Sequence, residues 1–334
     1  MGNLKIAVLG GGSWGTTVAA LTTRNMPVTI WARNPDTVDE INRDHRNETY
    51  LPGAALPENL RATNDIGEAV AGADVVVMGI PSQNFRSVLT EVRRHLRPWV
   101  PVVSLTKGLE LDTRMRMTQI ISEILPDHPV GVLTGPNLAR EIMAGQAAAS
   151  VIAMEDEVIV RSLQKVFNSG LFRVYTNSDV IGCELGGVLK NIIAIAVGMG
   201  DGQGAGDNTR AALITRGLSE VTRLGVAMGG CAETFAGLAG MGDMIATCTS
   251  PQSRNRHVGI ELGQGKTMET IAEEMFMVAE GAKSAPAVMA LAQEYDVDMP
   301  IARDVYRVIS GEMNARGAYR GLLRTHAGAE SEPG

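Results

Sequence analysis

The sequence IAVLGGGSWGTT, residues 6–17, decides the fold. A short apolar run is followed by the pattern G-x-G-x-x-G, formed by Gly10, Gly12 and Gly15, and then by residues that favour a helix. In a dinucleotide-binding turn the first glycine permits the tight turn, and the second lets a pyrophosphate approach the backbone. The third lets the helix pack closely on the strand. A plain glycine-rich turn is the alternative, but the strand–loop–helix context favours a dinucleotide site.

The first half of the chain continues this alternation of β-branched runs and helical patterns, which is typical of a parallel sheet covered by helices. A helix is expected over Thr16–Thr23. We expect strands at Ile6–Leu9, Val28–Trp31, Asp74–Ile80, Val102–Leu105, Val130–Leu133, Ser150–Ala153 and Arg173–Tyr175.

The pattern changes near residue 180, where helical periodicity replaces strand-like alternation. Leu185, Val188, Leu189 and Ile192 follow the spacing i, i+3, i+4, i+7 and predict a long helix. Later helices are expected at Ala285–Gln293 and Ala302–Ser310. The sequence therefore predicts an α/β, Rossmann-like NAD(P)-binding domain with a doubly wound, mostly parallel sheet (1–180). It predicts an all-α substrate-binding domain (181–325) and a disordered tail (326–334).

Composition narrows the class of protein. The chain has 334 residues, 45% of them hydrophobic, and a formal net charge of -7. This charge argues against nucleic acid or an anionic membrane as the main partner. Three cysteines and scattered histidines exclude a disulfide framework and a structural zinc site. No signal peptide, membrane anchor or stretch of roughly 18 apolar residues is found, so we expect a cytoplasmic protein.

The residue at the end of the second predicted strand bears on the choice of cofactor. NAD-specific sites usually place an acidic residue there, about 20 residues after the glycine loop. This chain has Arg33, which can accept a 2′-phosphate, so NADPH is an expected cofactor. Asp36 lies slightly further along and leaves NADH open.

Lys190 is the most informative residue of the second half. It lies in the apolar segment LGGVLKNIIAIA, and no acidic residue stands three or four positions away. A lysine on a solvated face is the ordinary interpretation, but this helix is apolar on nearly every side. We therefore expect a buried lysine, with a pKa lowered by desolvation, that faces a cleft and transfers a proton.

Three further polar segments are candidates for holding an anion. Ser253, Arg254 and Asn255 form a short polar loop that resembles a phosphate or carboxylate clamp, although a solvated turn is the ordinary interpretation. Asp243 could orient a lysine or a substrate hydroxyl. Two further candidates each follow a predicted strand, at the edge of the sheet where such folds bind ligands. They are Lys107 and the turn from Gly135 to Asn137.

These motifs together resemble the bacterial NAD(P)-dependent glycerol-3-phosphate dehydrogenases. The matching segments cover most of residues 4–310 in the family's order. They are GGGSWGT, IPSQ, SLTKGLE, GPNLARE, GVLKNIIAIAVGMGDG, GLAGMGDMIATCTSPQSRNR and VAEG.

The resemblance implies residue roles. Cofactor contacts would come from Gly10, Gly12, Ser13, Trp14, Gly15, Arg33, Lys107, Ala139, Arg254, Val278 and Glu280. Substrate contacts would come from Lys107, Gly135, Asn137, Lys190, Asp243, Ser253, Arg254 and Asn255. Lys190, Lys107 and Asp243 would be catalytic. Asn137 departs from the family's usual Ser or Thr, and Asn34 replaces a second basic residue.

The implied reaction is reversible hydride transfer between NADPH or NADH and C2 of dihydroxyacetone phosphate, which gives sn-glycerol 3-phosphate for phospholipid synthesis. The helical domain would close over the nucleotide-binding domain, and a homodimer is the assembly that the family suggests. Two alternatives are weighed: a β-hydroxyacid dehydrogenase of similar architecture, which would not need the Ser253–Asn255 clamp, and a dinucleotide sensor without turnover, which would not need Lys190.

Overall fold

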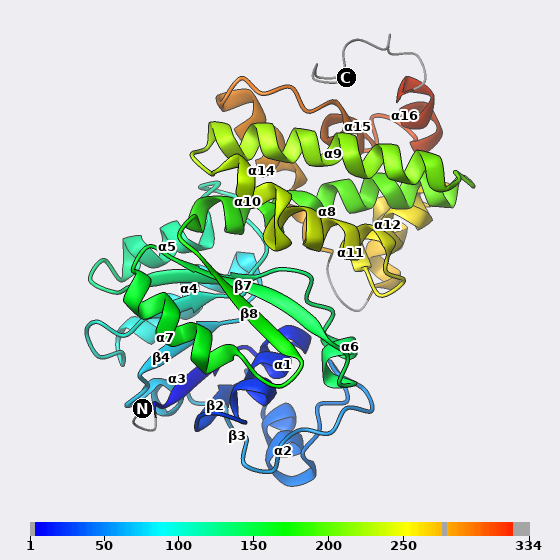
Figure 1. Cartoon of the computed structure of the whole chain (residues 1–334). Helices are drawn as coiled ribbons and strands as arrows, with labels where there is room; N and C mark the ends of the chain where they lie inside the picture. The colour runs from blue at the N-terminus through cyan, green and yellow to red at the C-terminus, as the bar shows by residue number, and fades with distance from the viewer. Residues whose placement is uncertain (1–3, 276–278, 323–334) are drawn as a thin grey trace. The chain divides into compact units, whose positions relative to one another are not determined.

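The computed structural model describes residues 4–275 and 279–322, in two compact units (Figure 1). The first unit comprises Met1–Lys107 and Met115–Val180, and the second comprises Gly108–Arg114 and Ile181–Gly334. The sequence analysis assigned residues 108–114 to the first half. The structure groups them with the second unit, because Leu109 is fully buried in the core of the helices. The predicted tail, 326–334, lies outside the described residues.

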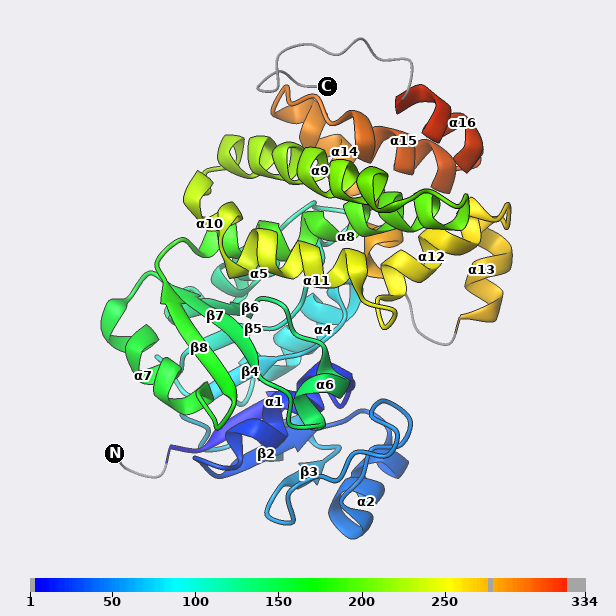
Figure 2. The same cartoon turned by 45° about the vertical axis from the view of Figure 1, so that its right-hand side comes forward.

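The first unit is built on one eight-stranded sheet of order β3-β2-β1-β4-β5-β6-β7-β8. Every neighbouring pair is parallel except β6 and β7, which are antiparallel. The predicted mostly parallel sheet is therefore confirmed. The strands are β1 (Ile6–Leu9), β2 (Val28–Trp31), β3 (Arg61–Thr63), β4 (Val75–Met78), β5 (Val102–Ser104), β6 (Val130–Thr134), β7 (Ala148–Met154) and β8 (Phe172–Asn177). Figure 2 shows β8 with α7 (Glu157–Phe167) beside it.

All seven predicted strands are present, two of them with the predicted bounds and five with ends shifted by at most two residues. The sequence analysis missed β3, which has only three residues, of which Thr63 alone is buried. Such a strand contains no apolar run or alternation that a sequence pattern could reveal.

Helices cover both faces of the sheet. Alternate residues of β1 face opposite sides, so that Ile6 and Val8 join one hydrophobic cluster while Ala7 and Leu9 join another. Besides α7, the helices of this unit are α1 (Ser13–Thr22), α2 (Pro35–Asp44), α3 (Ile66–Val70), α4 (Ser82–Arg93), α5 (Met117–Ile124) and α6 (Ala139–Met143). Residues of α1 and α7 belong to the first cluster, and residues of α3, α4 and α5 to the second. This two-faced burial is the doubly wound arrangement that the sequence predicts.

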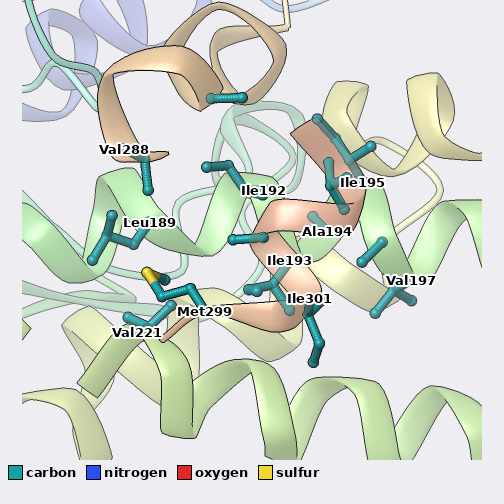
Figure 3. Close-up of a cluster of buried hydrophobic side chains, with 14 of the residues drawn as sticks. Leu189, Ile192, Ile193, Ala194, Ile195, Val197, Val221, Val288, Met299 and Ile301 are labelled. Atoms are coloured by element: carbon teal, nitrogen blue, oxygen red, sulfur yellow. The ribbon is translucent and has the colours of Figure 1, made fainter. Parts of the chain in front are cut away.

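The second unit is helical and centred on α8 (Val180–Gly202). Figure 3 shows Leu189, Ile192 and Ile193 of this helix among side chains from other helices. Around it lie α9 (Asp207–Ala227), α10 (Ala232–Ala236), the π-helix η1 (Leu238–Gly242), α11 (Asp243–Thr249), α12 (Arg254–Gly263), α13 (Met268–Glu274), α14 (Glu280–Glu294), α15 (Pro300–Ile309) and α16 (Ala315–Leu322).

The α8 helix is apolar and long enough to cross a membrane by length and composition, a property that the sequence analysis did not anticipate. Its most apolar window is 94% buried inside the protein. Because such burial is what a core helix requires, the apolar character of α8 is explained by packing within the helical unit.

Candidate functional site

The glycine loop has the close packing that its pattern predicts. Gly10 has a φ of +122°, and a Cβ added to it would lie 2.3 Å from the backbone oxygen of Gly79. A Cβ on Gly15 would lie 2.1 Å from the oxygen of Gly10. By contrast, a Cβ on Gly12 would meet no protein atom within 4 Å. The first and third glycines are thus required by the protein itself, whereas the second faces open space that suits a ligand.

The N-terminus of α1 borders this open space. Gly12 is the N-cap of α1 and has no side chain that could accept a hydrogen bond from the first turn. The N–H groups of that turn, beginning at Ser13, are therefore suited to an anion. Trp14 packs its ring edge-on against Phe172, at 6.1 Å between ring centroids. The open space at Gly12 and the N-terminus of α1 fit the pyrophosphate of a dinucleotide.

Asn47, which the sequence analysis missed, supports the glycine loop. Its side-chain amide donates to the backbone oxygen of Gly11 and to the Thr16 hydroxyl, both at 2.9 Å. The residue is fully buried. No local pattern could reveal it, because Asn47 stands 31 residues from Thr16.

Arg33 lies two residues beyond β2 and is exposed. Asn34 caps α2 by accepting a hydrogen bond from the backbone N–H of Asp36 at 3.0 Å. Asp36 is also exposed, in the first turn of that helix. Both candidates for ribose recognition therefore remain able to contact a ligand.

The ends of β5 and β6 bring Lys107 and the turn at Gly135 together. The Lys107 ammonium donates to the Gly135 backbone oxygen at 2.9 Å, and Gly135 has a φ of +135°. The Asn137 amide donates to the Ser150 hydroxyl at 3.2 Å, while its Oδ1 is buried without a hydrogen-bond partner among the described residues. The short helix α6 begins only at Ala139, so Asn137 precedes it.

Lys190 of α8 is buried against α11. Its ammonium lies 3.0 Å from Oδ1 of Asp243 and also donates to the Thr247 hydroxyl. That hydroxyl in turn donates to the Asp243 backbone oxygen at 2.6 Å. The side chains of Lys190 and Asp243 are only 5% and 3% exposed. The buried lysine is thus confirmed.

The expectation that Lys190 is unpaired was wrong. Its own helix face has no acidic residue, but the carboxylate of Asp243 comes from another helix, 53 positions later in the chain. This carboxylate counters the desolvation on which the sequence argument relied. Nearby, burial raises the pKa of the Cys248 thiol to about 12, so this thiol stays protonated and is not a nucleophile.

The predicted polar loop is the start of a helix, because Ser253 is the N-cap of α12 and Arg254 and Asn255 lie in its first turn. Ser253 caps α12 by accepting from the Arg256 backbone N–H at 3.2 Å. The Asn255 amide donates to Asn191 Oδ1 at 3.0 Å, and its oxygen accepts from the Gly281 backbone N–H at 3.0 Å. Since Asn191 follows Lys190 directly, the first of these bonds connects the start of α12 to the lysine-bearing helix α8, and the second connects it to α14.

Part of Arg254 is exposed to solvent, but its guanidinium is surrounded by enough protein atoms to be desolvated. This desolvation lowers the pKa of Arg254 below the ordinary arginine value, and the carboxylate of Glu280 acts in the opposite direction. Glu280 is the first residue of α14. Val278, another predicted cofactor contact, lies outside the described residues.

Comparison with known proteins decides the family. Two family models match, NAD-dependent glycerol-3-phosphate dehydrogenase N-terminus at residues 5–160 and C-terminus at residues 179–320. The chain belongs to this family. Family membership makes it an oxidoreductase that uses NADH or NADPH and acts on a CH–OH group, and nothing supports the β-hydroxyacid dehydrogenase alternative.

Individual family members are similar over their whole length. A glycerol-3-phosphate dehydrogenase [NAD(P)+] of Sphingopyxis alaskensis is 68% identical over 99% of both chains. One of Mycobacterium avium is 55% identical over 98% of this chain and 96% of the relative. The crystal structure of glycerol-3-phosphate dehydrogenase from Coxiella burnetii has a TM-score of 0.92 at 37% identity, covering 96% of this chain and 99% of that one.

Proposed function

We propose that this family member interconverts dihydroxyacetone phosphate and sn-glycerol 3-phosphate through the residues described above. The observation that supports this most directly is the buried pair of Lys190 and Asp243. The next residue of α8, Asn191, accepts a hydrogen bond from Asn255 in the first turn of α12. The residues proposed for proton transfer and for phosphate binding are thereby joined within one unit.

The cofactor is assigned to the first unit. Gly12 and the first-turn N–H groups of α1 would hold its pyrophosphate, and Arg33 would contact a 2′-phosphate where one is present. Lys107 and Ala139 are further proposed contacts there, and Glu280 and Arg254 are proposed from the second unit. When bound, the reduced nicotinamide supplies the hydride for the substrate's carbonyl carbon.

Lys190 is the proposed acid and base at the substrate oxygen. In the direction of reduction its ammonium donates a proton to the C2 oxygen, and in oxidation the amine takes the proton back. The Asp243 carboxylate at 3.0 Å and the Thr247 hydroxyl hold the Lys190 nitrogen in place. A fixed donor of this kind needs no reorganisation as charge develops on the oxygen.

The phosphate is assigned to Ser253, Arg254 and Asn255. The Arg254 guanidinium would supply charge-assisted hydrogen bonds to the phosphate. The Ser253 oxygen accepts a hydrogen bond from the Arg256 backbone, which leaves the hydroxyl proton available for a phosphate oxygen. Lys107, Gly135 and Asn137 are proposed as substrate contacts of the first unit. Holding the phosphate keeps the carbonyl oriented for reaction.

The experiment is to compare dihydroxyacetone phosphate with unphosphorylated dihydroxyacetone in the Arg254→Ala variant. One or two lost charged hydrogen bonds, at about 1.5–3 kcal/mol each, predict a fall in kcat/KM of at least tenfold for the phosphorylated substrate. With NADH held at saturation, so that any role of Arg254 in cofactor binding is not limiting, dihydroxyacetone turnover should hardly change. Arg303→Ala is the matched control, because Arg303 pairs with exposed Asp298 on the surface. Equal losses on both substrates would remove Arg254 from phosphate recognition.

A cytoplasmic location, a role in supplying phospholipid precursors and a homodimeric assembly are proposed from the family resemblance. Sedimentation of the purified chain tests the assembly, and a monomer at assay concentrations would contradict the dimer.

A further inference from the structure

Helices α8 and α12 approach each other through glycines. Gly198 and Gly202 of α8 meet Gly259 and Gly263 of α12, and a Cβ on any of the four would lie 2.1–2.5 Å from a backbone oxygen of the other helix. At such a contact the backbones touch directly. These four positions carry no side chains that could interlock, so polar contacts beside the glycines help to fix the register of the two helices.

One of these polar contacts is a buried carboxylate in the last turn of α8. Oδ2 of Asp201 accepts a hydrogen bond from Nε of Arg256 in α12 at 2.8 Å, and it forms an ion pair with Nη2 of the same guanidinium at 2.7 Å. Its Oδ1 accepts from Nε and Nη2 of Arg210 in α9, at 3.1 and 2.9 Å. The Asp201 side chain is only 8% exposed. Each oxygen of this carboxylate therefore faces two nitrogens of one guanidinium, a two-pronged contact between opposite charges, and charge-assisted contacts are stronger than neutral ones.

The position of this pair connects it to the proposed site. Asp201 follows Lys190 by eleven residues, which is about three helical turns, so both lie on the same side of α8. Arg256 directly follows Asn255 and is two residues after Arg254. The ion pair therefore joins the proposed phosphate-binding segment to the helix that holds the proton-transfer lysine.

We propose that Asp201 is a positioning residue for substrate phosphate: by holding Arg256, it sets where the first turn of α12 presents Arg254 and Asn255. This inference rests on the proposed function. Asp201 touches neither substrate nor cofactor in this proposal and acts through α12. In this proposal Arg256, which lies in the same first turn of α12, holds the helix in place and does not bind phosphate.

A purely electrostatic role for Asp201 predicts the opposite sign. If Asp201 acted only through its charge, removing it would leave the site more positive and would tighten binding of the phosphorylated substrate. If it positions α12, the same change weakens that binding, because a displaced arginine meets the phosphate poorly. The direction of the change in KM thus distinguishes the two roles.

The test is Asp201→Asn, assayed with dihydroxyacetone phosphate and with dihydroxyacetone. We expect kcat/KM for the phosphorylated substrate to fall roughly ten- to hundredfold, mainly through KM, since an error of about 1 Å in position can cost a hundredfold. At saturating NADH, turnover of dihydroxyacetone should stay within about twofold. Asp207→Asn is the matched control, because Asp207 also pairs with Arg210 but is 93% exposed and does not contact Arg256.

Arg256→Lys is the second variant, which keeps the charge but loses the two-pronged contact with Asp201. It should show the same selective loss at smaller size, and it decides the question if Asp201→Asn does not fold. An unchanged or lower KM for the phosphorylated substrate, or equal losses on both substrates, would overturn the proposal. If Arg254→Ala also fails to separate the substrates, the proposed phosphate site itself is wrong. A selective loss in Arg254→Ala alone rejects only the role of Asp201.

Discussion

Replacing Gly12 by alanine tests whether the open space beside the glycine loop belongs to the cofactor. Gly12 has a φ of -73° and a ψ of 175°, which alanine adopts without strain. The added Cβ meets no protein atom within 4 Å. The protein without cofactor should therefore accept the methyl group, while a bound pyrophosphate should not.

The two effects differ in size. Gly→Ala at a compatible backbone position stabilises by about 0.4–1 kcal/mol, and alanine at a helix N-cap loses a similar amount, so the free energy of unfolding should change by less than about 1 kcal/mol. Losing one or two hydrogen bonds to phosphate, at about 1.5–3 kcal/mol each, should raise the Kd for NADH by at least tenfold.

Thermal unfolding with and without NADH measures both effects. At a concentration of 100 times the Kd, NADH stabilises the native protein by about 2.7 kcal/mol, and a hundredfold weaker variant would gain only about 0.4 kcal/mol. Gly15→Ala is the matched control. Its Cβ would lie 2.1 Å from the Gly10 oxygen, so it should destabilise the protein by about 1–3 kcal/mol even without cofactor.

Two results would refute this reasoning. An unchanged Kd for NADH in Gly12→Ala would mean that the pyrophosphate does not approach this glycine. A loss of stability without cofactor as large as that of Gly15→Ala would mean that packing within the protein, and not the ligand, requires glycine there.

Three further predictions concern catalysis, cofactor choice and pH. Lys190→Ala should lower kcat by about 10²–10⁴-fold with the Kd for NADH unchanged, and a small loss of turnover would contradict the role of Lys190 in proton transfer. Arg33→Ala should raise the KM for NADPH relative to NADH in steady-state assays, and an unchanged ratio would move ribose recognition towards Asp36. Burial raises the pKa of Glu220 from 4.5 to about 7, although its carboxylate accepts from the backbone N–H groups of Ile301 and Ala302. The folded state then holds the Glu220 proton more tightly than the unfolded state does. The contribution of this proton to the free energy of unfolding is therefore complete below about pH 4.5 and is lost as the pH rises through 7. In Glu220→Gln the free energy of unfolding should fall by up to about 3 kcal/mol less than in the unmodified protein as the pH rises from 4.5 to above 7. Parallel pH profiles for the variant and the unmodified protein would contradict this prediction.

Local sequence was enough to predict the nucleotide-binding fold. Residues 6–17 form the strand, the loop and the start of the helix in one continuous stretch, so each glycine's role follows from its neighbours in the chain. Lys190 was found for the same reason, because a single charged residue within an apolar helix is visible without knowledge of any contact.

Local sequence could not reveal the partners of these residues. Thr247 contacts Lys190 across 57 positions, Asn191 contacts Asn255 across 64, and Asp201 contacts Arg256 across 55. A helical pattern indicates which residues share a face of their own helix, but it does not say which helix packs against that face.

The sequence alone thus determined the α/β and helical halves, the dinucleotide loop and the family resemblance, because each depends on residues close together in the chain or on motifs in a known order. The tertiary structure alone decided that Lys190 is paired, that Asn47 supports the glycine loop and that Asp201 forms an ion pair with Arg256 of α12. The physical reason is that a buried charge or amide must find a partner wherever packing brings one, and packing joins residues that the chain keeps far apart.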